Sequence, residues 1–114
     1  ILQGKWSRVH KTMGNENGFI GIPQTLLELR AEHEVAVIEI GIDAVGSMEQ
    51  HMQLVGANFS LLTAIGPEHL IHLKDTPTIA REEGIALLHV AKSNGTIAIN
   101  LDDPWIRPHL STIK

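Results

Sequence analysis

The sequence predicts a three-layer α/β fold, with a mainly parallel sheet and flanking helices. The run from Val35 to Ile40 is β-branched and almost wholly apolar, which is typical of a strand buried on both faces of a parallel sheet. Helical patterns alternate with further strand-like runs along the chain, which favours parallel pairing through crossovers. The expected strands are 9–12, 35–40, 59–65 and 96–100. We expect residues 1–114 to form a single partial domain.

The composition limits the function classes. The chain has 114 residues, of which 43% are hydrophobic and 19% charged, enough for one globular core. Its formal net charge is −4 without a Lys/Arg run, so no nucleic-acid partner is indicated. Without cysteine it has no disulfide, thiolate zinc site or thiol nucleophile, and a cytoplasmic location fits best. No apolar run approaches the roughly 20 residues of a membrane helix, so no membrane partner is expected.

A loop rich in Gly and Asn follows the first expected strand. Residues 13–23 hold three glycines, of which the first is Gly14, and two asparagines, Asn15 and Asn17. Such a loop allows left-handed turns and a close approach of backbone N–H groups to a ligand. Pro23 suits the first turn of the helix that follows, so the loop is a candidate anion site. It is no Walker loop, because no Gly-Lys-Ser/Thr follows, and a purely structural loop is the alternative.

Two further helices are expected. Ser47 and Gln50 have capping-box spacing, and a stripe of Met48, Met52 and Val55, ending at Gly56, suits core packing. The strand 59–65 leads into a loop with His69 at a carboxyl strand end. A long helix is expected to start with Thr76 as its cap and Pro77 at its first position, and to run to about Lys92. Asn94 and Gly95 then turn the chain into the last strand.

Two glutamates stand out. Glu39 lies near the carboxyl end of its apolar strand, where ligands bind in open α/β sheets. It is either a metal-holding carboxylate beside phosphates or a structural carboxylate capped by backbone donors or an Arg. Glu83 falls on the same helical face as Ile79 and Leu87, where a charge needs a partner, whereas Glu82 is expected to be solvated. A Glu at the stripe edge that reaches water is the alternative for Glu83.

Five segments in order, 12–27, 36–41 with Gly46, 65–70, 79–80 and 100–103, resemble the central ATP-binding domain of the Mur ligases. The resemblance is strongest to the branch that adds D-alanyl-D-alanine to UDP-N-acetylmuramoyl-tripeptide. It implies an ATP-dependent amide-bond ligase of peptidoglycan precursor synthesis. In this chemistry ATP phosphorylates a carboxylate, an amine attacks the acyl phosphate, and Mg²⁺ steadies the phosphates.

The resemblance also assigns residue roles. Glu39 and His69 match the residues that hold magnesium in the family. Asn15 matches an asparagine near the nucleotide-sugar peptide substrate, and we assign Gly14 and Asn17 of the same loop to that substrate. Glu83 stands where most Mur ligases carry a lysine that carbon dioxide converts to a carbamate. A glutamate supplies a carboxylate without carbon dioxide but on a shorter stem, so a water-mediated metal contact is expected.

Parts of the family pattern are missing. The Gly-Lys-Thr phosphate loop and the amine-binding carboxyl-terminal domain do not occur in this sequence, so we expect the chain alone not to turn over ATP. Two other interpretations remain open. One is a related ligase with another substrate, such as a polyglutamate or folate conjugate. The other is a non-catalytic α/β module that self-associates as a homo-oligomer through exposed edges. Right-handed crossovers should bring the Gly14–Gly21 loop, Glu39 and His69 to one rim of the sheet.

Overall fold

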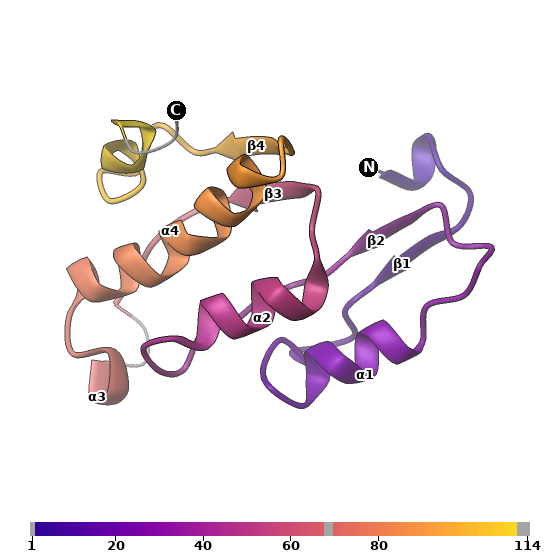
Figure 1. Ribbon diagram of the computed structural model, residues 1–114, viewed down its shortest axis with the longest axis horizontal. Coiled ribbons are helices and arrows are strands. Elements are labelled where there is room, and N and C mark those ends of the chain that lie inside the picture. The colour runs from indigo at the N-terminus through magenta and orange to yellow at the C-terminus, as the bar shows by residue number, and fades with distance from the viewer. Residues whose placement is uncertain (1, 68–69, 112–114) are drawn as a thin grey trace. The chain divides into compact units, whose positions relative to one another are not determined.

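The computed structural model describes residues 2–67 and 70–111. The chain is a mixed α/β structure with parallel strands and flanking helices (Figure 1), as predicted, and the three-layer arrangement stays a prediction. It divides into two compact units, Ile1–Gly41 and Ile42–Lys114. Each unit contains one pair of parallel strands. None of the described helices has the length and apolarity that a bilayer crossing needs.

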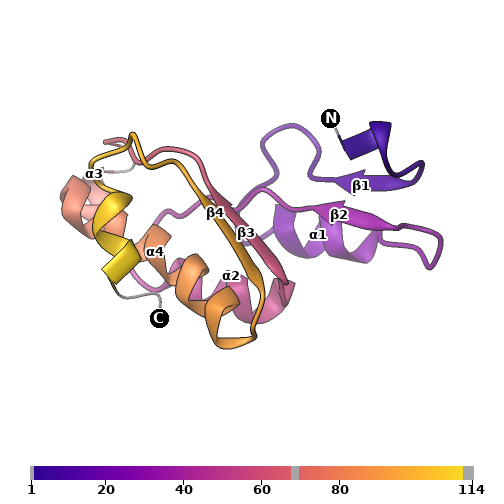
Figure 2. The same cartoon turned by 90° about the horizontal axis from the view of Figure 1, so that it is seen from above.

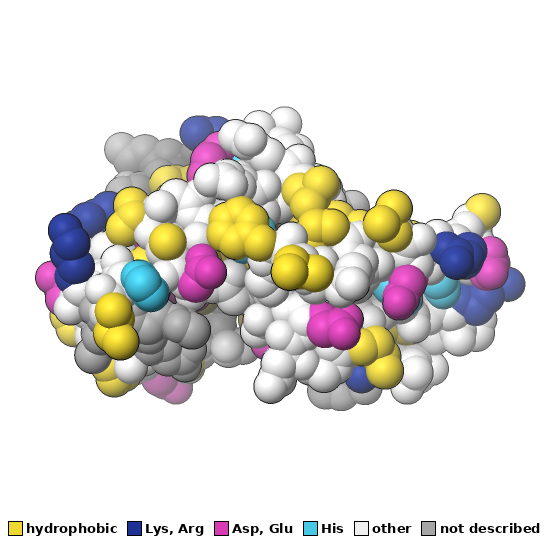
Figure 3. Space-filling view, turned by 90° about the horizontal axis from the view of Figure 1, so that it is seen from below, with side chains coloured by type: hydrophobic (Ala, Val, Ile, Leu, Met, Phe, Trp, Pro, Cys, Tyr) yellow, Lys and Arg dark blue, Asp and Glu magenta, His cyan; other side chains and the backbone are white. Residues whose placement is uncertain are grey.

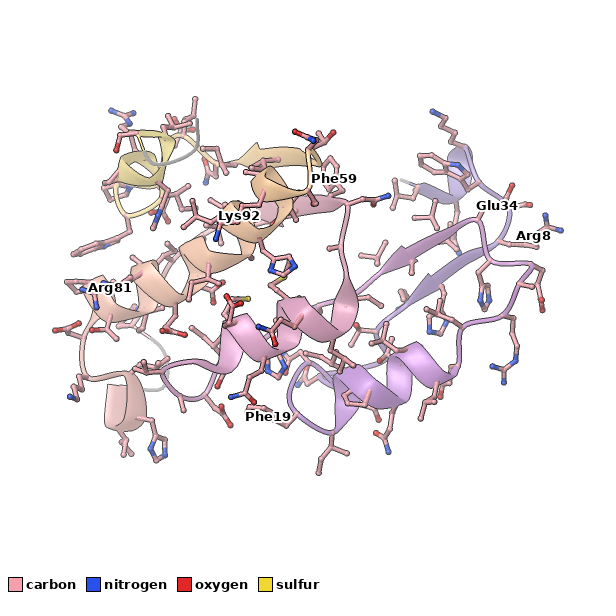
Figure 4. All side chains as sticks on the ribbon, viewed as in Figure 1. Arg8, Phe19, Glu34, Phe59, Arg81 and Lys92 are labelled. Atoms are coloured by element: carbon pink, nitrogen blue, oxygen red, sulfur yellow. The ribbon has the colours of Figure 1, made fainter. Side chains whose placement is uncertain are left out.

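The first unit contains a short 3-10 turn η1 (Leu2–Gly4), strands β1 (Val9–Lys11) and β2 (Val35–Val37), and helix α1 (Gly21–Leu27). The strands are parallel, with Val9 opposite Val35. Glu34 fastens the start of the pair, because its Oε2 accepts hydrogen bonds from the backbone N–H groups of Ser7 and Arg8, both at 3.1 Å (Figure 4).

Helix α1 is attached to β1 through a histidine. The Nε2 atom of His10 lies 2.8 Å from the backbone oxygen of Thr25 in α1, so Nε2 donates this hydrogen bond. Thr25 and Ile22 are buried, and the Thr25 hydroxyl donates to the backbone oxygen of Gly21 at 2.9 Å. Pro23 falls in the first turn of α1, as the sequence predicts. The unit therefore consists of one strand pair and one helix that is hydrogen-bonded to the pair through His10.

The prediction that the Val35–Ile40 strand is buried on both faces is wrong for this chain. The strand is shorter than expected, ending at Val37, and Val37 is 44% exposed. Within the described part of the unit, β2 has β1 as its single neighbouring strand and α1 as the single α-helix beside the pair. One strand and one short helix cannot cover both faces and both edges of β2.

The second unit contains helices α2 (Ser47–Val55), α3 (Leu70–Leu73) and α4 (Thr76–Lys92), strands β3 (Phe59–Leu62) and β4 (Thr96–Ile99), and a 3-10 turn η2 (Arg107–Ser111). The strands are parallel over their whole length, from Phe59 opposite Thr96 to Leu62 opposite Ile99. Helix α4 packs against both strands and against α2 and α3. Figure 2 shows α2 and α4 on the same side of the strand pair. The core side chains of this unit include Met48, Met52, Leu62, Leu73, Ile79, Leu87, Val90 and Ile106.

Both predicted helix caps in this unit are displaced by one residue. The N-cap of α2 is Gly46, with φ +90°, and Ser47 is already helical. The Ser47 hydroxyl instead donates to Asp43 Oδ1 at 2.9 Å in the preceding loop. The N-cap of α4 is Asp75, whose Oδ1 accepts from the Thr78 N–H at 2.8 Å, so Thr76 is the first helical residue. A carboxylate there accepts the free N–H groups of the first turn at least as well as a hydroxyl.

Candidate functional site

The candidate site begins where the strands of the first unit end. Thr12 follows β1 directly, and its backbone N–H donates to the Val37 oxygen at 3.0 Å, one step beyond the strand pairing. Its hydroxyl oxygen accepts the backbone N–H of Glu39 at 2.8 Å, and the Thr12 residue is 8% exposed. The buried hydroxyl therefore fixes the backbone of Glu39 at the rim. No functional role for Thr12 was predicted from the sequence, although Thr12 is the first residue of the longest segment that resembles the Mur ligases.

Asn17 and Glu39 meet at this rim. The Asn17 Nδ2 atom donates a hydrogen bond to Glu39 Oε1 at 2.8 Å. The backbone N–H of Gly41 donates to the backbone oxygen of Asn17, also at 2.8 Å. The Gly14–Gly21 loop and Glu39 thus share one rim, as predicted, whereas the third predicted member, His69, lies outside the described residues. Within the part of the chain that the structure describes, the Glu39 carboxylate is bonded to a side-chain amide, and not to the backbone donors or the arginine of the structural alternative.

The loop itself is tightly folded. Gly14 has φ +54°, the left-handed conformation that favours glycine. A Cβ at Gly21 would collide with the backbone of Glu16, so the loop returns over its own start. Asn15 lies between these points with an exposed side chain, and its backbone oxygen accepts from the Asn17 N–H at 2.9 Å. Asn15 is therefore accessible to a ligand, while the Asn17 amide is already bonded to Glu39.

In the long helix the buried glutamate is Glu82 and not Glu83. Glu82 is 5% exposed, and its Oε2 accepts from the Gly46 N–H at 2.8 Å, so the prediction of a solvated Glu82 is wrong. The reason is that α4 packs against α2 as well as against the strands, which widens its buried arc to position 82. Glu83 shares the face of Ile79 and Leu87, as predicted, and is half-buried.

His69 lies outside the described residues, but the segment that leads to it is well fixed. The Asp103 carboxylate accepts three backbone N–H groups, from Ile65 at 2.9 Å, Trp105 at 2.8 Å and Ile106 at 3.2 Å. These hydrogen bonds lower the pKa of the Asp103 carboxyl, and the bond from Ile65 has the largest effect. Asn100 adds a bond from its Nδ2 to the Thr63 oxygen at 3.0 Å. The 100–103 segment, noted in the sequence without a role, therefore ties the exit of β3 to the exit of β4.

The donor set at Glu39 suits a hard cation. Glu39 is exposed, one carboxylate oxygen is bonded to Asn17, and within residues 2–67 and 70–111 the other oxygen, Oε2, receives no hydrogen bond. Mg²⁺ commonly keeps several waters and binds proteins through one or two carboxylates. Among the described residues no group of three or more His, Asp or Glu is arranged to hold a metal. The convergence of Glu39, His69 and Glu83 on one ion stays a prediction.

The fold and this rim are those of an α/β domain whose candidate site lies outside the carboxyl ends of parallel strands. Residues 1–114 match the family model described as the Mur ligase middle domain. The chain belongs to the Mur ligase family.

Curated relatives and solved structures agree with this assignment. The chain is 33% identical over 104 residues to the UDP-N-acetylmuramoyl-tripeptide–D-alanyl-D-alanine ligase of Bacillus subtilis (strain 168), covering 91% of this chain and 22% of that protein. The enzyme of the same name from Treponema pallidum (strain Nichols) is 38% identical over 76 residues, covering 67% and 17%. A crystal structure of MurF from Acinetobacter baumannii superposes with a TM-score of 0.82 at 25% identity, over 97% of this chain and 25% of that one. The chain thus spans about a fifth of the curated relatives it matches.

Proposed function

We propose that this chain forms the metal-side part of the active site of a ligase that joins D-alanyl-D-alanine to a UDP-N-acetylmuramoyl-tripeptide. The observation that carries the proposal is the placement of Glu39 beside the Asn17 loop at the carboxyl rim of β1 and β2. The names of the curated relatives supply the substrates. Residues 1–114 act as a single partial domain within a longer cytoplasmic enzyme.

The proposed reaction forms an amide bond in two steps. A carboxylate oxygen of the nucleotide-sugar peptide attacks the γ-phosphorus of ATP, giving an acyl phosphate and ADP. The amine of the incoming dipeptide then attacks the acyl carbon, and phosphate leaves as the amide forms. Bound Mg²⁺ would neutralise charge on the phosphates during the transfer.

The residues of this chain have separate roles in the proposal. Glu39 would hold Mg²⁺ through Oε2, with His69 as the second ligand. Asn15, exposed beside the left-handed turn at Gly14, would contact the nucleotide-sugar peptide. Glu83 would contact the metal through water. The chain alone would not be competent, because the Gly-Lys-Thr loop that holds ATP phosphates in the family lies outside this sequence.

The test is an assay of the full-length protein with ATP, UDP-N-acetylmuramoyl-tripeptide and D-alanyl-D-alanine. We expect phosphate release that depends on both the tripeptide and the dipeptide. Glu39→Gln should lower the affinity for Mg²⁺ by at least the roughly 10- to 100-fold that loss of an outer hydrogen-bonding partner costs, because it changes a direct ligand. Turnover with a folate and glutamate, and none with the dipeptide, would favour the other ligase class instead. Full Mg²⁺ affinity in Glu39→Gln would refute the metal role of Glu39.

Self-association remains the second candidate function, and exposed apolar side chains support it. Phe59 and Leu61 lie on one face of β3 and are 53% and 62% exposed, and Ile71 in α3 is 91% exposed. Apolar side chains are also visible on the surface in Figure 3. Sedimentation of the isolated 1–114 chain separates the candidates, because a module that self-associates gives a dimer or larger species at micromolar concentration. A clean monomer at high concentration would contradict this candidate.

A further inference from the structure

We propose that Asn17 is a positioning residue for the Glu39 carboxylate, and not a substrate ligand. The inference rests on the proposed metal role of Glu39. An ionised carboxylate only accepts hydrogen bonds, so the amide end that faces Glu39 Oε1 at 2.8 Å must be the NH₂ group. The bond occupies one oxygen of an otherwise exposed side chain and leaves Oε2 open to solvent and to a cation.

The backbone on both sides of this bond is already fixed. The backbone N–H of Glu39 donates to the buried Thr12 hydroxyl oxygen, and the backbone N–H of Gly41 donates to the backbone oxygen of Asn17, both at 2.8 Å. The backbone segments that carry the amide and the carboxylate are therefore held in register by contacts other than the bond between these side chains. Little conformational freedom is left for the carboxylate to lose when a cation binds, which favours binding.

Gly41 leaves the space that the amide needs. A Cβ built at Gly41 would lie 3.0 Å from both Cγ and Oδ1 of Asn17, closer than a relaxed contact. A methyl group at position 41 must therefore shift the amide by a few tenths of an ångström from its place beside Glu39. This gives a way to disturb the hydrogen bond without altering either of its partners.

The expected effect follows from the way outer hydrogen bonds act on metal ligands. A carboxylate that ligates a metal is usually fixed by a hydrogen-bonding partner, and loss of that partner weakens metal affinity by about 10- to 100-fold. Because the Asn17 amide is engaged at Oε1, we expect Glu39 to bind the metal through Oε2 alone. Asn15, with its exposed side chain, keeps the role of substrate contact.

The experiment measures Mn²⁺ binding to the full-length protein by electron paramagnetic resonance, with saturating non-hydrolysable ATP analogue. It is paired with the KM for the UDP-sugar peptide. Asn17→Ala should weaken Mn²⁺ binding by about 10- to 100-fold while leaving this KM within about twofold. Asn15→Ala should raise this KM and leave Mn²⁺ binding unchanged. A raised KM with unchanged Mn²⁺ affinity in Asn17→Ala would overturn the inference.

Gly41→Ala provides an independent test, also if Asn17→Ala does not fold. It should weaken Mn²⁺ binding in the native background and have no further effect when combined with Asn17→Ala, because the displaced amide is then already gone. Unchanged Mn²⁺ binding in Gly41→Ala alone would overturn the inference, and so would additive effects of the two substitutions where both variants fold.

Two controls complete the design. Gln53→Ala removes a matched amide–carboxylate bond, from Gln53 Nε2 to Glu49 Oε1 at 2.9 Å on the surface of α2, and should leave Mn²⁺ binding unchanged. An equal loss in this control would also count against Asn17. Glu39→Gln separates the metal role of Glu39 from the positioning role of Asn17. If it weakens Mn²⁺ binding and Asn17→Ala does not, the positioning role alone falls; if neither does, the metal role and the positioning role fall together.

Discussion

The buried carboxylate of Glu82 accepts a hydrogen bond from the backbone N–H of Gly46, with 2.8 Å between Oε2 and N. The bond joins the middle of α4 to the residue that starts α2, and these helices pack against each other. Glu82→Ala removes the acceptor and leaves the Gly46 N–H without it. We expect a loss of about 1–3 kcal/mol in the free energy of unfolding, measured by urea denaturation.

Neighbouring positions supply the controls for this prediction. Glu82→Gln keeps a carbonyl oxygen that can accept from Gly46 and should recover most of the stability. Arg81→Ala changes an exposed side chain of the same helix and should alter the free energy of unfolding by no more than about 0.5 kcal/mol. Equal losses from Arg81→Ala and Glu82→Ala would contradict a specific role for the hydrogen bond.

The difference between Glu82 and Glu83 shows what helical periodicity can and cannot predict. The spacing of Ile79, Leu87 and Val90 gives the centre of the buried face, and these residues are buried as expected. Periodicity does not give the width of that face. The width depends on how many elements pack on the helix, and the contact with α2 extends it to position 82. No local pattern in the sequence reports that contact.

The sequence could predict that the Gly14–Gly21 loop and Glu39 meet at one rim. It could not predict the hydrogen bonds between them. The carboxyl ends of parallel strands share one edge, so a loop after β1 and a carboxylate after β2 are expected to meet. Which asparagine bonds to Glu39 depends on the fold of the loop, which is set by the left-handed Gly14 and by the close packing at Gly21. The exposure of β2 was also missed, since the composition of a strand does not state how many strands flank it.

The cap of α4 gives a direct test by substitution. Asp75→Ala removes the acceptor of the Thr78 N–H and should cost about 1 kcal/mol in the free energy of unfolding. Thr76→Ala at the adjacent position removes a hydroxyl from a residue that is already helical, and should cost much less. Thermal or urea unfolding of both variants measures the difference. A larger loss of stability in Thr76→Ala than in Asp75→Ala would show that Thr76 is the N-cap, as the sequence predicted.

Asp103 predicts a dependence of stability on pH. Backbone hydrogen bonds, first that of Ile65, lower the pKa of this carboxyl in the folded protein below its ordinary value of 3.8. A lowered folded-state pKa means that the unfolded chain binds the proton more tightly. The contribution of Asp103 is therefore complete above about pH 4 and is lost as the pH falls toward the lowered folded-state pKa.

The measurement is the free energy of unfolding between pH 2 and pH 6 for the native protein and for Asp103→Asn. The variant should be less stable at pH 6, and the difference should shrink as the solution is acidified. Asp102→Asn, which changes an exposed neighbour, serves as the control. A constant difference between Asp103→Asn and the native protein over this range would show that the carboxylate charge does not matter.

Glu83 carries the last prediction, because the resemblance to the Mur ligases matches it to a lysine that carbon dioxide converts to a carbamate. In the native protein it is half-buried on the face of Ile79 and Leu87. Glu83→Gln keeps the volume and the hydrogen-bonding capacity and removes the charge. If the carboxylate contacts the metal through water, the Mg²⁺ concentration for half-maximal turnover of the full-length enzyme should rise about tenfold or more, with the fold intact.

Two comparisons decide between this role and a structural one. If Glu83 only borders the apolar face, Glu83→Gln should leave the Mg²⁺ dependence unchanged and change the free energy of unfolding by no more than about 0.5 kcal/mol. Glu32→Gln, at an exposed position, is the control and should have the same small effect. Glu83→Lys tests the same site from the other side. A lysine there should give activity that rises with added carbon dioxide, because the carbamate restores a negative ligand on a longer stem. Activity of Glu83→Lys that ignores carbon dioxide, with a native Mg²⁺ dependence in Glu83→Gln, would remove Glu83 from the metal site.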